Sequence, residues 1–460
     1  MKQHYQLAVV GAGSGGREAA LTAAKEGLQV LLIERATLGG TCLHHGCYPV
    51  RALRACADVT KDQQLSSKFG LENTGVTFGF EKWLTIQRRV SARLTQEVNN
   101  QLEKAGVAVR FANATLTAPS QLRIASSHGE VEEIRADHIV VATGSRPRFD
   151  QMRPGSRYLN SNGLLARTEI PGHLLIVGGG YIGCEFASIF RSLGSEVTLV
   201  EKEQRLLPTW DASLGGYLEA CLRSAGISIE LGYEIDLPNP DELLEESQLV
   251  IEAGTRIRSD LVLVATGRKP NLETLGLEDL GIETNPFVAV NEQLQTTCPT
   301  IFAVGDINGL SLLDSAAVVQ ARIAIGAILG RKEEFSARWI PRSIHTDPPI
   351  ASVGWNEDDA GRAGLGVICH SQTFRLVTDD ERTVINPLPT MVKILLQSES
   401  RHILGVHVVG THAAEIVNLA SMAVRAGLTL DQVLQVPLVH PSATEVFQEC
   451  ANCLGRIPAG

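Results

Sequence analysis

The sequence has few aromatic residues and no long uninterrupted apolar run. Phe, Trp and Tyr together make up 5% of the 460 residues. No apolar segment approaches the roughly 18 residues that a membrane-spanning helix needs. The first residues, MKQHYQLAVVGAGSGG, do not have the layout of a signal peptide. These absences argue against a membrane protein and predict a soluble protein of the cytoplasm.

An excess of basic charge is also missing. The chain has 41 Lys and Arg residues against 51 Asp and Glu residues, a net charge of -10, and the two signs are mixed. Nucleic-acid binding usually depends on a basic surface, so nucleic acid is not expected as the main partner. Hydrophobic residues make up 44%, enough to bury large cores, which excludes disorder as the main state. At roughly 150 residues per domain, the length suggests about three domains.

Cysteine is present but does not form the pattern of a secreted disulfide framework. The nine cysteines are odd in number and widely scattered. Zinc sites usually need paired ligand clusters, and no metal site is expected here. Only two pairs are close in sequence, Cys42 with Cys47 and Cys450 with Cys453. The second pair is three residues apart in an expected helix, where we expect core packing.

Residues 5–34 have the pattern of a strand, a glycine loop, a helix and a second strand. Gly11 permits a tight turn, Gly13 lets the backbone approach a pyrophosphate, and Gly16 allows close helix–strand packing. The N-terminus of the helix then faces the phosphates. Glu34 lies 23 residues after Gly11, where an acid can bind ribose hydroxyls. This combination predicts a dinucleotide site.

The same pattern recurs in LLIVGGGYIGCEFASIFRSLGSEVTLVE. Its glycines are Gly178, Gly180 and Gly183, and Glu201 again lies 23 residues after the first of them. Two such units predict two dinucleotides, most simply FAD and a nicotinamide cofactor. A carboxylate at Glu201 would accept from a ribose and repel a 2′-phosphate, which favours NAD over NADP. Arg205 lies nearby and could soften that preference.

Two shorter motifs support this pairing of sites. Ala-Thr-Gly occurs at 142–144 and at 265–267, each time after an apolar strand and before a proline-containing turn. IFAVGDI places an aspartate just past another apolar strand, where its carboxylate can accept from a ligand hydroxyl. Taken singly, each motif is better interpreted as a strand followed by a capped turn, and the two dinucleotide units favour the binding role. The candidates are Thr143, Gly144 and Asp306 for FAD and Gly267 for NAD.

The segment LGGTCLHHGCYPVRAL follows the first dinucleotide unit. Cys42 and Cys47 lie in its glycine-flanked loop, which leads into an expected helix, and they could form a small disulfide. A cysteine near a helix start is a better thiolate, because the helix dipole favours negative charge there. Two buried structural cysteines are the alternative, but the position beside a flavin-type unit favours a redox pair. Gly40 and Thr41 are further FAD-binding candidates.

The run GGTC-x4-GC-x-P, the two glycine fingerprints, VGD and HP-x3-E resemble the pyridine nucleotide–disulfide oxidoreductases. That family includes lipoamide dehydrogenases, glutathione reductases and mercuric reductases, and the similarity runs from Val9 to about Glu449. It implies an α/β fold with two Rossmann-like dinucleotide-binding domains and an α+β C-terminal dimerisation domain. The implied domains are FAD-binding at 1–147, NAD-binding at 148–270, a central segment completing the FAD site at 271–337, and dimerisation at 338–460.

The resemblance also implies a chemistry. Electrons would pass between nicotinamide, flavin, a Cys42–Cys47 disulfide and an external dithiol or disulfide. Cys42 would be the interchange thiol, and Cys47 the thiolate in charge-transfer contact with flavin. Exchange needs a base; His440 matches the family base and Glu445 the carboxylate that orients it. In relatives this histidine reaches the other subunit, so a homodimer with His440 supplied across the interface is expected.

Three departures from the family pattern stand out. Arg51 occupies a position where members of the family usually have a lysine, and the resemblance implies that Arg51 faces Glu185. Arginine is a planar fork rather than a compact ammonium, so the redox poise and the rate are in doubt. His44 and His45 replace uncharged residues and are expected to face solvent. Leu438 stands where lipoamide-specific relatives often have a second histidine.

The substrate is narrowed by further comparison with the family. Leu21 replaces a carboxylate-binding arginine and Glu18 adds negative charge, so glutathione disulfide fits poorly. Mercuric reductases usually lack a base such as His440, and soluble transhydrogenases lack the full cysteine pair. These features favour an NAD-dependent dihydrolipoyl dehydrogenase acting on a lipoyl-bearing protein or a small disulfide. The alternatives are an NAD(P)H-dependent reductase of another small disulfide or a metal ion, with Cys450 and Cys453 as a relay, and a flavin-binding redox sensor with little turnover.

Overall fold

The computed structural model describes most of the chain. It leaves out residues 1–2, 71–74, 76, 151, 153–155, 236, 238–247, 251–255, 375–388 and 456–460. The described chain packs into two compact units. The first unit consists of residues 1–52, 81–150 and 268–337, and the second of residues 53–80, 151–267 and 338–460. The expected division into four domains stays a prediction.

The first unit is built on a seven-stranded sheet with the order β3-β2-β1-β6-β5-β4, and β16 pairs with β6. The strands β3, β2, β1, β6 and β16 run parallel, and β4 and β5 add an antiparallel edge. The bounds are β1 Gln3–Val10, β2 Val30–Glu34, β3 Ala108–Phe111, β4 Asn113–Ala118, β5 Gln121–Ala125, β6 Val131–Val141 and β16 Ile301–Ala303. A small ribbon, β7 Ser145–Pro147 with β15 Arg268–Pro270, completes the unit.

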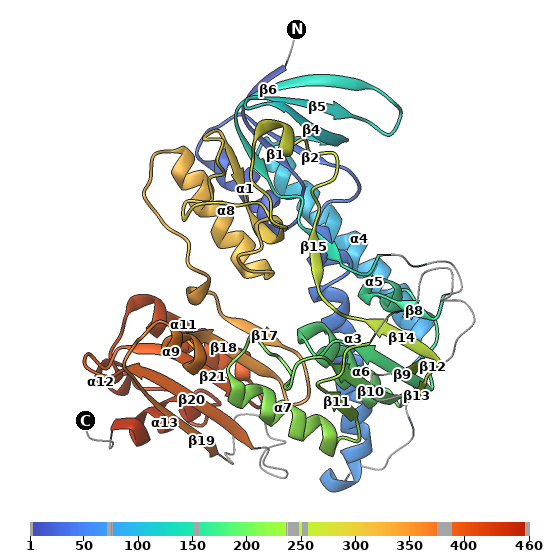
Figure 1. Cartoon of the computed structure of the whole chain (residues 1–460), viewed down its shortest axis with the longest axis vertical. Coiled ribbons are helices and arrows are strands. Elements are labelled where there is room, and N and C mark those ends of the chain that lie inside the picture. The colour runs from blue at the N-terminus through green and yellow to red at the C-terminus, as the bar shows by residue number, and fades with distance from the viewer. Residues whose placement is uncertain are drawn as a thin grey trace. The chain divides into compact units, whose positions relative to one another are not determined.

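Two helices far apart in the sequence lie side by side in the first unit (Figure 1). They are α1 (Ser14–Lys25) and α8 (Asp314–Ile328). A Cβ added at Gly15 would lie 3.3 Å from the Val304 side chain and 3.4 Å from that of Ala317, so the glycine sets how closely these helices approach. The short α2 (Gly40–His44) precedes α3 (Cys47–Leu65), and α3 and α4 (Phe80–Lys104) contribute residues to both units.

The second unit contains a five-stranded parallel sheet with the order β11-β10-β9-β14-β8. Its strands are β8 Tyr158–Leu159, β9 His173–Val177, β10 Glu196–Glu201, β11 Ser228–Leu231 and β14 Leu261–Val264. The central strands are nearly continuous buried apolar runs, as expected for a sheet covered on both faces. Its helices are α5 Ser161–Leu165, α6 Tyr181–Ser192 and α7 Ala212–Ser224, and β12 Gln248–Val250 pairs with β13 Arg256–Arg258.

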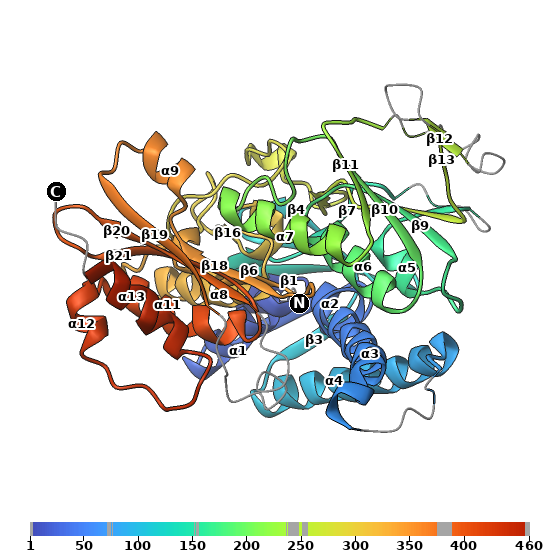
Figure 2. The same cartoon turned by 90° about the horizontal axis from the view of Figure 1, so that it is seen from below.

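The C-terminal part of the second unit is an antiparallel sheet with the order β17-β18-β21-β20-β19. The strands are β17 Arg342–Ile344, β18 Ile350–Gly354, β19 Val367–Phe374, β20 Thr390–Gln397 and β21 Ile403–Val409, and α9 is Glu357–Arg362. Figure 2 shows α11 (Ala413–Ala426), α12 (Leu430–Leu434) and α13 (Glu445–Gly455) gathered on one side of it. Their apolar faces and the sheet share one core. The two nucleotide-type sheets and this α+β part confirm the predicted fold class.

A buried charged cluster joins the start of helix α7 to the antiparallel sheet. Asp211 caps α7 and accepts from Lys393 Nζ at 2.9 Å on each oxygen, although both side chains are almost fully buried. His407 on β21 is fully buried, with its Nε2 3.8 Å from Asp211. Its Nδ1 lies 2.8 Å from Ser352 Oγ and its Nε2 lies 3.0 Å from the Trp355 carbonyl. This pattern suits a neutral imidazole that donates once and accepts once.

Within the described residues, no helix is both long enough and apolar enough to cross a lipid bilayer.

Candidate functional site

The first glycine loop has a geometry that only glycine allows. Gly11 has a φ of 103°, and a Cβ added there would lie 2.5 Å from the Ala142 carbonyl oxygen. A Cβ at Gly16 would lie 1.8 Å from the Gly11 carbonyl oxygen. Gly13 is the N-cap of α1, so no side chain covers this helix end. The first-turn N–H groups face outward there, which suits a pyrophosphate.

Glu34 ends β2 beside this loop, and the backbone fixes its carboxylate. Oε2 accepts from the Ala12 N–H and Oε1 from the Ala36 N–H, each at 2.8 Å. A carboxylate oxygen has more than one lone-pair direction, so both oxygens keep capacity for a ligand hydroxyl. The glycine loop and Glu34 together fit the adenosine and pyrophosphate half of FAD.

The second glycine loop repeats this geometry. Gly178 has a φ of 110°, and its added Cβ would lie 2.6 Å from the Ala265 carbonyl oxygen. A Cβ at Gly183 would lie 1.9 Å from the Gly178 carbonyl oxygen. Gly180 is the N-cap of α6. Gly267, with a φ of 112°, follows Ala265 at the end of β14. This loop fits a second dinucleotide.

The acid of the second loop is held in the same way. Glu201 is nearly buried, and its carboxylate accepts from Gly179 N at 2.5 Å and from Glu203 N at 2.9 Å. Arg205, which could have softened the preference for NAD, is engaged elsewhere. Its guanidinium donates to the Pro208 carbonyl at 2.9 Å and to Asp358 at 3.1 Å. The charge of Arg205 is therefore partly neutralised by a partner on α9.

The predicted redox pair lies beside the first glycine loop. Cys42 is in α2 and Cys47 begins α3. Gly40, with a φ of 60°, lies directly against Gly13, because a Cβ added to Gly40 would be 2.6 Å from the Gly13 Cα. The exposed Thr41 follows in α2. This contact between loops holds the cysteines next to the loop that fits FAD.

The carboxylate of Asp314, which the sequence analysis did not identify, lies beside the two cysteines. The two sulfurs and a carboxylate oxygen of Asp314 all lie within 4.8 Å of one another. A hydrogen bond with Cys47, burial and the charge of Asp314 raise the pKa of the Cys42 thiol well above its usual range. Asp314 is the first residue of α8, and an acid in the first turn of a helix is a weak signal because it is common.

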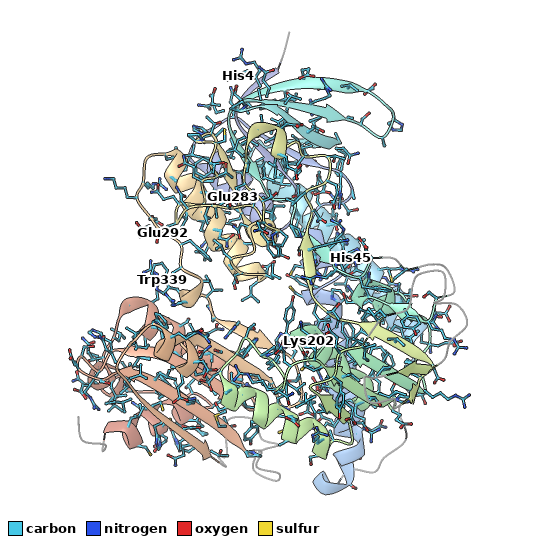
Figure 3. The ribbon with its side chains drawn as sticks, viewed as in Figure 1. His4, His45, Lys202, Glu283, Glu292 and Trp339 are labelled. Carbon is cyan, nitrogen blue, oxygen red and sulfur yellow. The ribbon has the colours of Figure 1, made fainter. Side chains whose placement is uncertain are left out.

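The prediction that both loop histidines face solvent is wrong for His44. Its Nε2 lies 2.9 Å from the Leu38 carbonyl, and the side chain is half-buried. The reason is local, since Gly39 adopts a φ of 107° at the start of α2 and the preceding carbonyl needs a donor. The neighbouring His45, labelled in Figure 3, is exposed as expected.

Asp306 lies in a polar network of the first unit. Its Oδ2 accepts from Ser145 Oγ at 2.5 Å, and Arg268 Nε donates to the same hydroxyl at 2.7 Å. Burial raises the pKa of Asp306, while Ser145 and Arg268 oppose that rise. Arg268 follows the second Ala-Thr-Gly motif directly, so the motif could have identified it.

Thr143 is engaged by the chain itself. Its Oγ1 donates to the Asn271 carbonyl at 2.9 Å, and Asn271 Nδ2 donates to the Thr143 carbonyl at 2.8 Å. Asn271 N also donates to the carbonyl of Gly144, at 3.0 Å. These bonds fasten the first Ala-Thr-Gly turn to the segment after β15. The contacts of Thr143 and Gly144 with FAD stay predictions.

The predicted base and its orienting acid are in contact in the second unit. His440 Nδ1 lies 2.9 Å from Glu445 Oε1, and Glu445 Oε2 accepts from Ser442 N at 2.8 Å. The hydrogen bond with His440 lowers the pKa of Glu445. With Nδ1 donating, Nε2 is the nitrogen that accepts a proton in a neutral imidazole. The His440 side chain is 83% exposed.

Two other expectations have different outcomes. Arg51 in α3 and Glu185 in α6 belong to different units, and their pairing stays a prediction. Glu185 Oε1 accepts a hydrogen bond from His345 N at 2.7 Å.

Cys450 is fully buried in the C-terminal core, and burial followed by the charge of Cys453 raises its pKa to about 12. A buried thiol with that pKa is a poor electron relay, so core packing describes it better.

Two family models match this chain. The model described as pyridine nucleotide-disulphide oxidoreductase matches residues 5–325. The model of that family's dimerisation domain matches residues 340–451.

The chain is also similar to individual proteins along its whole length. It is 33% identical to the dihydrolipoyl dehydrogenase of Chlorobaculum tepidum over 453 residues, covering 97% of this chain and 96% of the relative. A dihydrolipoyl dehydrogenase of Bacillus subtilis is 32% identical, with 98% of both chains covered. The Cu(II) complex of the HOCl-induced flavoprotein disulfide reductase RclA from Escherichia coli has a TM-score of 0.84, 27% identity and 99% and 100% coverage. LpdA from Mycobacterium tuberculosis, at 24% identity, has a TM-score of 0.87 with 98% and 99% coverage and shares the fold.

Proposed function

Because this chain belongs to the pyridine nucleotide-disulphide oxidoreductase family, whose members are oxidoreductases that use FAD and NAD(H), we propose that it is a dihydrolipoyl dehydrogenase. The proposed reaction oxidises a dihydrolipoyl dithiol to its disulfide and reduces NAD+ to NADH and a proton. The observation that carries the proposal is the position of Cys42 and Cys47, held beside the first glycine loop by the contact of Gly40 with Gly13.

The residues of this chain carry out the sulfur chemistry. His440 Nε2 takes a proton from one substrate thiol, and the resulting thiolate attacks the sulfur of Cys42 in the Cys42–Cys47 disulfide. That bond breaks, and Cys47 leaves as a thiolate. The second substrate thiol then displaces Cys42 and gives its proton to that leaving sulfur, which closes the substrate disulfide and leaves Cys42 as a thiol and Cys47 as a thiolate. Bound FAD supplies the two-electron carrier between the cysteine pair and the nicotinamide.

The dyad of His440 and Glu445 supplies the base. Its exposure on the C-terminal part of the chain suits a group that acts on a neighbouring molecule. The match to the dimerisation domain supports a homodimer. We infer that His440 of the partner subunit reaches the Cys42–Cys47 pair, so that one active site takes residues from two chains.

We propose NAD rather than NADP as the nicotinamide cofactor. The Glu201 carboxylate at the end of β10 would accept from the adenosine ribose and repel a 2′-phosphate. Its two backbone hydrogen bonds keep this charge in place beside the second glycine loop. Arg205, which follows Lys202 as a second basic residue of the next turn, is already paired with Asp358.

A second candidate function is the reduction of another small disulfide or of a metal ion by NAD(P)H at the same cysteine pair. The observation that favours it is the full-length likeness to RclA, at 27% identity, which was solved as a Cu(II) complex. The two candidates share their residues and differ in the direction of electron flow. Assays with different substrates, rather than features of the site, therefore distinguish the two candidate functions.

The test is a steady-state assay of the purified yellow protein with dihydrolipoamide and NAD+, following NADH absorbance. We expect NADH formation that falls by about 10²-fold or more in H440A, the range for loss of a general base. Oxidation of NADH by Cu(II) or a small disulfide, without dihydrolipoamide turnover, would support the second candidate instead. Bound FAD and a reducible cysteine pair without turnover of either kind would point to a redox sensor.

A further inference from the structure

The Asp314 carboxylate occupies a position beside the redox sulfurs to which the proposed reaction gives no task. It begins the 15-residue helix α8, and one of its oxygens lies within 4.8 Å of both Cys42 Sγ and Cys47 Sγ. Ser14 Oγ donates a hydrogen bond to Asp314 Oδ1. This hydroxyl, at the start of α1, fixes the carboxylate on the side of the sulfurs.

The other polar groups near Cys42 do not balance this charge. Cys47 shares a hydrogen bond with Cys42, and as a thiolate it adds a second negative charge beside it. Of the two histidines in the loop, His44 is turned to the Leu38 carbonyl and His45 is exposed. The positive end of the α8 dipole would favour a thiolate, but Asp314 stands at that end and offsets it. Asp314 is thus a fixed carboxylate whose charge and hydrogen bond act on Cys42 in the same direction as those of Cys47.

A fixed carboxylate has a definite effect on a neighbouring thiol. Its negative charge disfavours the thiolate, and it accepts a hydrogen bond from S–H but not from S⁻. The raised pKa of Cys42, to which Cys47, burial and Asp314 all contribute, agrees with this direction. Environments that stabilise the thiolate of a reduced pair make its disulfide a stronger oxidant. An environment that disfavours the thiolate acts in the opposite sense.

We propose that Asp314 is a positioning residue of the redox pair: it holds reduced Cys42 as a thiol and makes the Cys42–Cys47 pair a stronger reductant. This inference rests on the proposed redox role of the two cysteines. Cys42 of the reduced pair then keeps its proton until a base removes it. Reduction of a sulfur substrate by the pair, which is the reverse of the proposed reaction, therefore needs a base such as His440.

The first test is the pH dependence of thiol alkylation in the reduced holoenzyme. Iodoacetamide modifies thiolates, and fragmentation of the peptide containing both cysteines separates Cys42 from Cys47. We expect Asp314→Asn to move the Cys42 midpoint to lower pH and to speed alkylation at pH 7 by about tenfold, the change that one pKa unit represents. Asp314→Glu should retain the wild-type profile. Coincident profiles of Asp314→Asn and wild type would overturn the proposal.

The matched control is Glu18→Gln, which removes the same charge from the adjacent helix α1. Glu18 pairs with Arg322 of α8 rather than with the sulfurs. An equal shift in this variant would show a general charge effect and would also overturn the proposal. Ser14→Ala provides a second route, because it releases the Asp314 carboxylate without removing it; a smaller shift in the same direction is expected. The flavin absorbance of each variant reports whether it has folded.

The second test is the equilibrium of the cysteine pair with reduced and oxidised dithiothreitol. Asp314→Asn should become half-reduced at a ratio of reduced to oxidised reagent about tenfold lower than wild type, and an unchanged ratio would contradict the proposal. Neither test uses dihydrolipoamide or NAD+. A shifted profile without dihydrolipoamide turnover would reject the proposed dehydrogenase and keep the role of Asp314, and the converse result would do the opposite.

Discussion

Gly40 lies directly against Gly13, so that the segment carrying Cys42 and Cys47 and the loop that begins α1 meet backbone to backbone. A Cβ added to Gly40 would lie 2.6 Å from the Gly13 Cα, and Gly40 has a φ of 60°. The contact determines where the two sulfurs lie relative to the first glycine loop, which we propose as the FAD site. A side chain here has to separate the loops.

We therefore predict that Gly40→Ala loses most of its FAD and at least about tenfold in turnover, because misplacing reacting groups by 1 Å can cost 10²-fold. The measurement is the ratio of flavin absorbance to protein, together with the rate. Gly27→Ala is the matched control, since Gly27 also has a positive φ of 86° but nothing lies within 4 Å of its added Cβ. Gly27→Ala should lose only about 1 kcal/mol of folding stability, from backbone strain at a positive φ. Full FAD occupancy in Gly40→Ala would show that the loops can separate freely.

Glu445 is predicted to act only through His440. Glu445→Gln keeps the size of the side chain but replaces the charge that fixes Nδ1 as the donor. We expect kcat to fall by at least about tenfold, less than the roughly 10²-fold or greater loss in His440→Ala. The double variant should be no worse than His440→Ala alone, which a comparison of the three rates will show. Additive losses would mean that Glu445 has a separate task.

Asp358 is predicted to influence the choice of nicotinamide cofactor. It holds the guanidinium of Arg205, which follows the acid at the end of β10. Asp358→Asn should free this charge for a 2′-phosphate and raise kcat/KM for NADP+ several-fold, with that for NAD+ nearly unchanged, since one surface ion pair is worth about 1 kcal/mol or less. Asp359→Asn, on the same helix, is the control. Unchanged use of NADP+ would show that Arg205 lies out of reach of the ribose.

His407 is predicted to make the protein sensitive to acid. Burial lowers its pKa to about 4, so the unfolded chain binds a proton near pH 6.5 that the folded chain takes up only near pH 4. Stability should therefore fall by about 3 kcal/mol from pH 7 to pH 4 from this group alone. Urea unfolding at several pH values measures the loss, and His407→Gln should show a flatter profile. A wild-type profile that stays flat over this range would contradict the prediction.

Below pH 4, Asp211 of the same cluster becomes the group whose protonation lowers the stability. Burial alone would raise the pKa of Asp211, but the charges around it and the Ser213 hydrogen bond hold the value at about 2. A carboxylate with a lowered pKa stabilises the fold above its unfolded value and loses that contribution as the pH falls toward 2. The two losses have the same sign and follow one another.

The parts of the site predicted from the sequence are those specified by neighbouring residues. Gly16 and Gly183 each approach a glycine carbonyl five residues earlier in the same loop, and the Gly178–Glu201 unit could be recognised from its own spacing. His440 and Glu445 are five residues apart and lie in one motif. Their contact therefore needs little of the fold to form.

The parts that could not be predicted depend on residues far apart in the chain. Ser14 and Asp314 are 300 positions apart and meet because α1 packs on α8. Asp211 at the start of α7 and Lys393 on β20 are in contact although they are 182 positions apart. The predicted solvent-facing position of His44 is wrong because its partner is a backbone carbonyl, and a backbone partner cannot be identified from residue types. Packing, rather than residue type, decides these contacts.

The two glycine loops are one structural module used twice. The added Cβ atoms of Gly11 and Gly178 would stop 2.5 Å and 2.6 Å from a carbonyl oxygen, and those of Gly16 and Gly183 would stop 1.8 Å and 1.9 Å from another. Duplication of one ancestral segment would leave such a match. The geometry of the loops therefore does not determine which of the two proposed dinucleotides binds. An exchange of cofactors should leave both loops unchanged and alter the residues around them.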